Sequence, residues 1–428
     1  MFNFKINNDN APESPSLLDV KGLLHDKVIE ELEENFTNFN ELDLAIAVRA
    51  ISQEIEFFDG LDLSDLQISQ IISAVADDLS GYGPIAPYMI DENISDILIN
   101  DFNDIWVDKQ GRLVKTPSSF DNSKHLLRFI ERALNQCGKQ TNTLSPVVDG
   151  KLPDGSRLNV IIPPACTTTA IVSIRKFSHK TITKSYLIQS GLIDSNWLEF
   201  LECAVEAGAN IVVSGNAGAG KTSFLNVLSS AISENERVVT IEESSELKLH
   251  HNHVVQLEAH SANSDDKGSI SLSELVKAAL RMRADRVIIG EVRSSEVIDM
   301  LQAMSCGHQG SMTTVHANSA YDAISRISTL TQLHNQQFSS DHIDALIGSC
   351  LQLIIHLIRD SDGKRKLKSI GEVYYEEGTL KFRTLYSDTD RFIFDKSESA
   401  IIKFMRMRGI EESRLEALFQ NIEGSDDD

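Results

Sequence analysis

One segment governs the architecture of this chain: Gly215-Asn216-Ala217-Gly218-Ala219-Gly220-Lys221-Thr222. It fits the pattern GxxxxGK[ST] in full. The glycines allow backbone N–H groups to turn inward around a phosphate, and the start of a following helix adds the positive end of its dipole. We therefore predict that residues 215–222 form a loop that binds the phosphates of a nucleotide.

The context of this loop agrees with phosphate binding. The apolar strand predicted over residues 211–213 precedes it, and a helical run over residues 224–232 follows it. In such a loop the Lys221 ammonium reaches the β- and γ-phosphates, and the Thr222 hydroxyl is a ligand for Mg²⁺. A glycine-rich turn without a ligand is the alternative, and the flanking strand and helix favour the phosphate site.

Acidic residues follow two further strands that the sequence predicts. Glu291 comes after the apolar run 287–289, and Glu242 and Glu243 come after the run 238–241, with Glu246 close behind. In a parallel sheet these strand ends lie on the same edge as the phosphate loop. A carboxylate there can hold Mg²⁺ or align a water for attack on a phosphate. Solvated loop acids are the alternative interpretation, and for Glu243 and Glu246 the two interpretations are balanced.

Two histidines lie near a fourth predicted strand. His308 stands in Gly307-His308-Gln309-Gly310, and His316 ends the run 312–315. An imidazole at the edge that holds the phosphate loop can contact a γ-phosphate and respond to its loss. On the residues alone, a hydrogen-bonded structural histidine is the simpler interpretation of both.

The order of predicted elements indicates an α/β protein with a preceding α+β domain. Apolar runs without alternation, as at 211–213 and 287–289, are typical of parallel strands that are covered on both faces. Helical segments separate these runs, as in a doubly wound sheet. Two further runs, 368–375 and 379–386, flank Glu377-Gly378 and predict a hairpin. The predicted organisation comprises a helical segment over 1–80 with a disordered start, an α+β domain over 81–179, a linker over 180–196, the α/β domain over 197–400, and a C-terminal helix with an acidic tail over 401–428.

Composition excludes several classes of protein. Hydrophobic residues make up 41% of the 428 residues and charged residues 24%, as in globular proteins. Neither an apolar run long enough to cross a membrane nor a secretory signal is predicted. Five scattered cysteines without a CxxC pair argue against a disulfide scaffold or a four-cysteine zinc site, and they fit a cytoplasmic protein. The net charge of −23 disfavours broad binding to nucleic acid.

In the order of these motifs the chain resembles the type II/IV secretion ATPase superfamily. The resemblance rests on the phosphate loop, on Ile241-Glu242-Glu243, on Val287-Ile288-Ile289-Gly290-Glu291, and on the segment from Gly307 to Asn318. Leu152-Pro153-Asp154-Gly155-Ser156-Arg157 and Ser173-Ile174-Arg175-Lys176-Phe177 are similar to the CpaF/TadA branch, which serves tight-adherence (Flp) pili. The resemblance extends from about Tyr82 to about Tyr386.

The resemblance implies a RecA-like P-loop domain that binds ATP and Mg²⁺, and it implies roles for individual residues. Glu242 matches the glutamate that polarises the attacking water, and Glu291 matches an atypical Walker B acid. His308 and His316 fall in a histidine box. Arg157 and Arg175 match arginines of the N-terminal domain that approach the nucleotide phosphates, where a guanidinium stabilises the transferred phosphoryl group. Expected catalytic residues are therefore Lys221, Glu242, Glu291, His316, Arg157 and Arg175; expected nucleotide ligands are residues 215–222 and His308; expected metal ligands are Thr222 and Glu291.

The resemblance also implies partners. A homo-oligomer, most simply a hexameric ring, is expected on the cytoplasmic side of the inner membrane. Membrane platform proteins of a pilus or secretion system are its expected partners, and an acidic ring would be attracted to their basic cytoplasmic loops. Nucleic acid is not an expected partner. The alternatives are a conjugation-type (type IV) secretion ATPase, a RecA-like nucleic-acid translocase with a basic channel, and a non-hydrolysing nucleotide-binding scaffold.

Overall fold

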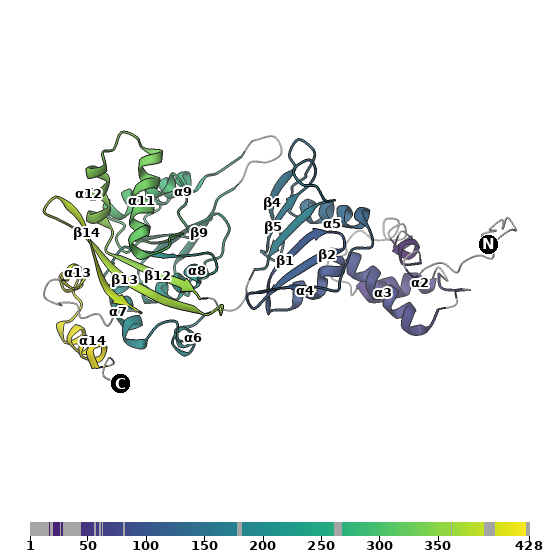
Figure 1. Ribbon diagram of the computed structural model, residues 1–428, viewed down its shortest axis with the longest axis horizontal. Coiled ribbons are helices and arrows are strands. Elements are labelled where there is room, and N and C mark those ends of the chain that lie inside the picture. Colours follow the sequence, from purple (N-terminus) through teal and green to yellow (C-terminus); the bar gives the residue numbers. More distant parts are fainter. Residues whose placement is uncertain are drawn as a thin grey trace. The chain divides into compact units, whose positions relative to one another are not determined.

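The computed structural model describes residues 17, 20–25, 27–28, 44–54, 57–59, 61, 63–79, 82–177, 182–260, 268–360, 362–388 and 399–424. The chain divides into two compact units, residues 1–178 and residues 179–428 (Figure 1). The disordered start that we expected over 1–15 and the acidic tail over 425–428 lie outside the described residues.

The first unit begins with helices that pack on one another. They are α2 (Leu44–Glu54), α3 (Asp65–Leu79), the 3₁₀ turn η1 (Gly83–Ile85) and α4 (Ala86–Ile90). Apolar residues of α3 recur at helical spacing, and Ile71, Ile72 and Val75 are buried. They share a small core with Val48 of α2 and with Leu24 of a short helical stretch at residues 20–25.

A six-stranded antiparallel sheet completes the first unit. Its strands are β1 (Ile94–Asp101), β2 (Asp104–Lys109), β3 (Arg112–Lys115), β4 (Val147–Lys151), β5 (Arg157–Ile161) and β6 (Ile171–Arg175), in the order β3-β2-β1-β6-β5-β4. Helix α5 (Ser123–Gln136) buries Phe129 and Ile130 in a core with Ile97 of β1 and Val172 of β6. Successive strand residues alternate between this core and the other face, as in antiparallel sheets with one covered side.

The second unit contains an eight-stranded sheet and the helices around it. Its strands are β7 (Ile211–Gly215), β8 (Val238–Glu242), β9 (Val254–Glu258), β10 (Arg286–Ile289), β11 (Met312–Val315), β12 (Leu353–Arg359), β13 (Arg365–Glu376) and β14 (Thr379–Ser387). Its helices are α6 (Lys184–Gln189), α7 (Ser195–Glu206), α8 (Lys221–Leu228), η2 (Ser229–Ala231), α9 (Leu272–Ala279), α10 (Glu296–Ser305), α11 (Ala320–His334), α12 (Ser340–Cys350), α13 (Ala400–Met407) and α14 (Glu412–Gly424). Among the described residues, every helix is too short or too polar to serve as a membrane-spanning segment.

The strand order of this sheet is β14-β13-β12-β7-β11-β10-β8-β9. Strands β12 to β9 are parallel to one another, and β13 and β14 add an antiparallel hairpin. Ile211 and Val213 of β7 enter one hydrophobic core, and Val212 enters a second core on the opposite face. The α/β fold, the RecA-like arrangement and the hairpin around Glu377-Gly378 are confirmed.

The stretch 180–196, which we expected to be a linker, differs in its described part. Thr183 caps α6 by accepting a hydrogen bond from the amide of Tyr186. Leu187, Leu192 and Ile193 are buried in the same core as β7. A single C-terminal helix was also expected, but α13 and α14 are separated at Gly409, whose positive φ of 88° ends α13 in the left-handed conformation.

The burial of helix α6 in the core of the second unit can be tested by mutation. Leu187 is 1% exposed, whereas its neighbour Ile188 is 40% exposed. Leu187→Ala should lower the free energy of unfolding by about 2–4 kcal/mol because it leaves a cavity in the core. Ile188→Ala should change it by less than about 1 kcal/mol. Urea denaturation of the full chain with Trp106 replaced by Phe, followed by the fluorescence of Trp197 in the same core, measures both. Equal midpoints for the two variants would mean that α6 does not belong to this core.

Candidate nucleotide site

The phosphate loop leaves the fully buried strand β7 and enters helix α8. Gly218 and Gly220 have positive φ values of 73° and 91°, a region that side chains other than glycine rarely adopt. A Cβ atom added to Gly215 would stand 2.3 Å from the carbonyl oxygen of Leu357 on β12. The chain can therefore follow this path only with glycines, which leaves the loop backbone bare for a phosphate.

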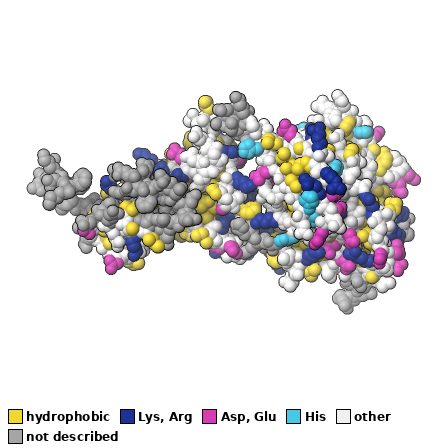
Figure 2. Space-filling view, turned by 180° about the vertical axis from the view of Figure 1, so that it is seen from behind, with side chains coloured by type: hydrophobic (Ala, Val, Ile, Leu, Met, Phe, Trp, Pro, Cys, Tyr) yellow, Lys and Arg dark blue, Asp and Glu magenta, His cyan; other side chains and the backbone are white. Residues whose placement is uncertain are grey.

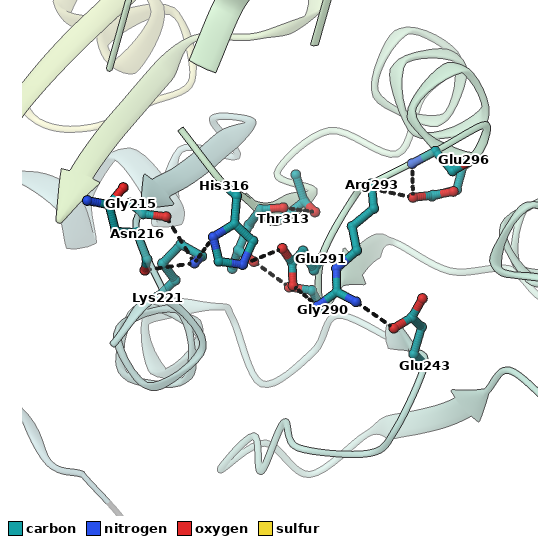
Figure 3. A network of polar contacts seen from close by, with 12 residues as sticks. Gly215, Asn216, Lys221, Glu243, Gly290, Glu291, Arg293, Glu296, Thr313 and His316 are labelled. Carbon is teal, nitrogen blue, oxygen red and sulfur yellow. Dashed lines mark hydrogen bonds and ion pairs between the residues drawn. The ribbon is translucent and has the colours of Figure 1, made fainter. Parts of the chain in front are cut away.

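Lys221 is the first residue of α8 and is only 7% exposed. Its Nζ donates hydrogen bonds to the carbonyl oxygens of Gly215 at 3.1 Å and Asn216 at 3.3 Å. Burial lowers the pKa of this lysine, and the nearby Glu291 carboxylate opposes that effect. The ammonium thus lies against the loop that is predicted to bind phosphate (Figure 3).

Strand β11 brings His316 between Lys221 and Glu291. Nδ1 of His316 lies 3.3 Å from Nζ of Lys221, and Nε2 lies 2.9 Å from Oε1 of Glu291. A lysine ammonium can only donate, so Nδ1 is the acceptor in the contact with Lys221, while Nε2 faces the carboxylate of Glu291. Burial is the largest cause that lowers the pKa of His316, followed by the charge of Lys221. A neutral imidazole therefore links the lysine of the loop to the acid of the next strand.

Arg293 extends this chain of contacts beyond Glu291. Its guanidinium donates to Oε2 of Glu291 at 2.6 Å and to Oε2 of Glu243 at 2.9 Å. These contacts, first of all the hydrogen bond to Glu291, raise the pKa of Arg293. Sequence reasoning did not select Arg293; its position two residues after Glu291 was the available signal. Glu243 and Glu291 are thus paired with a cation rather than freely solvated.

Glu242 is the buried acid of the site, at 4% exposure. Its carboxylate accepts hydrogen bonds from the backbone amides of Glu246 and Leu247. Burial outweighs these bonds and raises the pKa of Glu242 to about 7. A Cβ atom added to Gly290 would stand 2.9 Å from Cγ of Glu242, so only glycine fits beside this side chain. Glu242 therefore packs directly against the residue that precedes Glu291.

The parallel register explains why these groups meet. Strand β11 lies between β7 and β10, and β10 pairs with β8. Thr314 of β11 donates a hydrogen bond of 2.7 Å to the carbonyl of Gly290, which fixes the end of β10. Because all four strands point the same way, their carboxyl ends present Lys221, Glu242, Glu291 and His316 at one edge. On the face shown in Figure 2, histidine and basic side chains gather beside acidic ones in this unit.

His308 does not belong to this cluster. It precedes β11, and its Nδ1 lies 2.8 Å from the carbonyl oxygen of Ala284, which precedes β10. Both positions lie at the amino ends of their strands, the edge opposite to the phosphate loop. Within this unit His308 therefore lies apart from the phosphate loop and bonds to the backbone, and the contact with nucleotide that the resemblance implied for it stays a prediction.

Arg157 and Arg175 lie in the other unit, on its antiparallel sheet. They are directly opposite one another on β5 and β6, so both side chains project from the same face. The side chain of Arg175 is 68% exposed, and its Nε donates to Asp96 at 3.0 Å. The two arginines that the resemblance selected are thus cross-strand neighbours.

The donor set of the loop edge fits a Mg²⁺-nucleotide. The bare glycine backbone and Lys221 suit phosphate oxygens. The hydroxyl of Thr222, the second residue of α8, and the carboxylate of Glu291 are hard oxygen donors of the kind that Mg²⁺ prefers. Asn216, Ala217 and Ala219 contribute backbone amides rather than side-chain chemistry to such a loop.

The fold and the site define a RecA-like P-loop protein. Comparison with known proteins identifies its family: residues 78–408 match the family described as type II/IV secretion system protein, and the chain belongs to it. A conjugal transfer protein of Mycobacterium tuberculosis strain H37Rv is 30% identical over 352 residues, which cover 81% of this chain and 99% of the relative. The type IV secretion system protein PtlH of Bordetella pertussis is 29% identical over 317 residues, which cover 68% and 93%. The VirB11 ATPase of Brucella suis, solved with sulphate, has 23% identity and a TM-score of 0.37 over 71% of this chain and 98% of that one.

The raised pKa of Glu242 predicts a dependence of stability on pH. The carboxyl holds its proton more tightly in the folded chain, with a pKa of about 7 against an ordinary value of 4.5. Stability that is present below pH 4.5 is therefore lost as the pH rises through 7. Glu242→Gln cannot ionise, so between pH 5 and pH 8 the free energy of unfolding of the wild type should fall by roughly 2.5 kcal/mol relative to this variant. Urea unfolding at both pH values measures the difference, with the exposed Glu243→Gln as control. If the free energy of unfolding changes with pH in the same way for the wild type and for Glu242→Gln, then Glu242 is not buried as a neutral acid.

Proposed function

We propose that this protein is a Mg²⁺-dependent ATPase that powers assembly of a tight-adherence (Flp/Tad-type) pilus, or protein secretion, through an inner-membrane platform. The observation that carries the proposal is the linked set Lys221–His316–Glu291 beside the phosphate loop, with the buried Glu242 packed on Gly290. Membership of the type II/IV secretion family supports the coarser part of the proposal. The CpaF/TadA assignment rests on the segments around Arg157 and Arg175.

Each group in the site has a role in hydrolysis. Bound Mg²⁺ would neutralise phosphate charge, with Thr222 and Glu291 as its protein ligands. Lys221 turns from the loop carbonyls toward the β- and γ-phosphates. Glu242 polarises the attacking water, and its pKa of about 7 suits a general base near neutral pH. His316 contacts both Lys221 and Glu291, so it responds when Lys221 turns from one state to the other.

The arginines of the first unit supply charge from outside the α/β unit. In the proposed cycle, ATP binding closes the domain over 81–179 onto the domain over 197–400, and Arg157 and Arg175 then approach the transferred phosphoryl group. A guanidinium there stabilises the charge that spreads in the transition state. Hydrolysis releases the closure, and a homo-oligomeric ring, most simply a hexamer, converts this motion into work.

The proposed location is the cytoplasmic side of the inner membrane. Platform proteins carry basic cytoplasmic loops, to which a chain with a net charge of −23 is attracted. A conjugation-type secretion ATPase is the second candidate, because the relative from Mycobacterium tuberculosis is named as a conjugal transfer protein. Stimulation of ATPase activity by DNA would favour a nucleic-acid translocase over both.

The first functional prediction concerns Lys221. Lys221→Ala removes the ammonium from the β- and γ-phosphates, so the rate of ATP hydrolysis should fall by about a hundredfold or more. Phosphate release from Mg²⁺-ATP by the purified full chain measures the rate. Lys277→Ala, which removes an exposed ammonium from α9 of the same unit, should hydrolyse ATP like the wild type. Wild-type turnover by Lys221→Ala would exclude residues 215–222 as the phosphate site.

A second prediction concerns Arg157 and Arg175. Groups that act only in the closed transition state change kcat much more than KM. Arg157→Ala and Arg175→Ala should each lower kcat by about a hundredfold, with a much smaller rise in KM. Arg112→Ala, at the edge strand of the same sheet, should leave both constants unchanged. Steady-state ATPase kinetics measure both constants. A wild-type kcat in both variants would mean that neither arginine takes part in hydrolysis, and the proposed domain closure would lose its support.

A further inference from the structure

The hairpin formed by β12 and β13 contacts the phosphate loop from the side opposite to β11. Strand β12 is parallel to β7, with Leu357 aligned to Gly215. It continues to Arg359, so its last residues run beside the loop that follows β7. The close approach of the Leu357 carbonyl to Gly215 fixes the spacing of the two backbones at the base of the loop.

A tight turn then brings a second arginine to the same place. Oδ1 of Asp360 accepts hydrogen bonds from the amides of Asp362 and Lys364, which closes the turn. The register of the hairpin sets Arg365 directly opposite Arg359. Both arginines therefore belong to the turn end of the hairpin.

Both side chains lie against glycines of the phosphate loop. Nε of Arg365 donates a hydrogen bond of 3.1 Å to the carbonyl of Gly218. A Cβ atom on Gly220 would stand 3.0 Å from Cδ of Arg365, and one on Gly218 would stand 3.2 Å from Nη1 of Arg359. Arg365 thus binds the carbonyl of Gly218, and the guanidinium of Arg359 lies next to the same glycine in the middle of the loop.

The charges of this pair are not balanced by acids in the described part of the chain. Like charges directly opposite on neighbouring strands repel one another. Asp360, the acid of the turn, forms its ion pair with Lys366 instead. Among the described residues, neither Arg359 nor Arg365 forms an ion pair with a carboxylate. A half-buried guanidinium that covers a phosphate loop, with its charge unpaired, is suited to an anion that arrives with the ligand.

We propose that Arg359 is a further ligand for the phosphates of the bound nucleotide, and that Arg365 is a positioning residue that holds the loop open through the Gly218 carbonyl. This inference rests on the proposed function, because it assigns residues to the same nucleotide site. It differs from the roles of Arg157 and Arg175, because Arg359 and Arg365 belong to the unit that carries the loop and act when the nucleotide binds.

Equilibrium binding of fluorescent (mant-labelled) ATP and ADP to the full chain tests the proposal. Arg359→Gln should weaken the binding of both nucleotides by about tenfold or more, as expected for the loss of a charged hydrogen bond. Arg359→Lys keeps the charge and should recover most of the affinity. Lys364→Gln removes the same charge from the same hairpin, but among the described residues its exposed side chain forms no hydrogen bond or ion pair with the loop, and the affinity of this variant should stay within about twofold of wild type.

The role of Arg365 is tested by comparing nucleotide affinity with the midpoint of unfolding. Arg365→Gln should weaken ATP and ADP by the same factor, because loop geometry serves both, while the unfolding midpoint without nucleotide stays at the wild-type value. Arg365→Lys can still donate to the Gly218 carbonyl and should restore binding.

Wild-type affinity in Arg359→Gln would overturn the assignment of Arg359. A fall in the affinity of Arg365→Gln that only follows a fall in its unfolding midpoint would overturn the assignment of Arg365. If Lys221→Ala binds weakly while both arginine variants bind normally, the proposed function stands and this inference fails. If the wild type binds neither nucleotide, both fail.

Discussion

The parallel pairing of β8, β10, β11 and β7 is the constraint on which the site depends. Lys221, Glu242, Glu291 and His316 are far apart in sequence: the segment from Lys221 to His316 spans almost a hundred residues. Because the four strands run in the same direction, parallel pairing alone places their last residues at one edge of the sheet. The hydrogen bond from Thr314 to the Gly290 carbonyl then fixes the edge locally, so that His316 stands between an ammonium and a carboxylate.

Burial changes the chemistry of the groups at this edge. Desolvation raises the pKa of Glu242 and lowers those of Lys221 and His316, which means that it disfavours the charged form of each. Each of these groups is therefore less stable as an ion than it would be in water. A phosphate group bound next to Lys221 would stabilise the charged form of this lysine and so offset part of the free-energy cost of burying it. The site is therefore suited to bind the phosphates of the proposed nucleotide.

Most of the site could be predicted from sequence, because strand ends and a glycine-rich loop have local signatures. Lys221, Glu242, Glu291 and His316 are brought together as that reasoning required. His308 lies apart from these four residues, because a histidine near a strand does not reveal which end of the strand it occupies, and its contact with nucleotide stays a prediction. Leu187 was assigned to a linker because a six-residue helix is too short to show periodicity. Arg359 and Arg365 were missed because their partners in the phosphate loop lie far away in sequence, and only the register of the sheet brings them into contact. Arg293 was missed although its partner Glu291 stands only two residues before it. The CpaF/TadA assignment stays a prediction.

The contact between Glu242 and Gly290 has a consequence for how this sequence can vary. The side chain of Glu242 fills the space that any Cβ at residue 290 would need. An acid at the end of β10 must therefore stand at residue 291, one position beyond the glycine, as long as residue 242 keeps a long side chain. Residue 290 can therefore gain a side chain only if residue 242 is shortened at the same time, whereas residue 242 can be shortened without any change at residue 290.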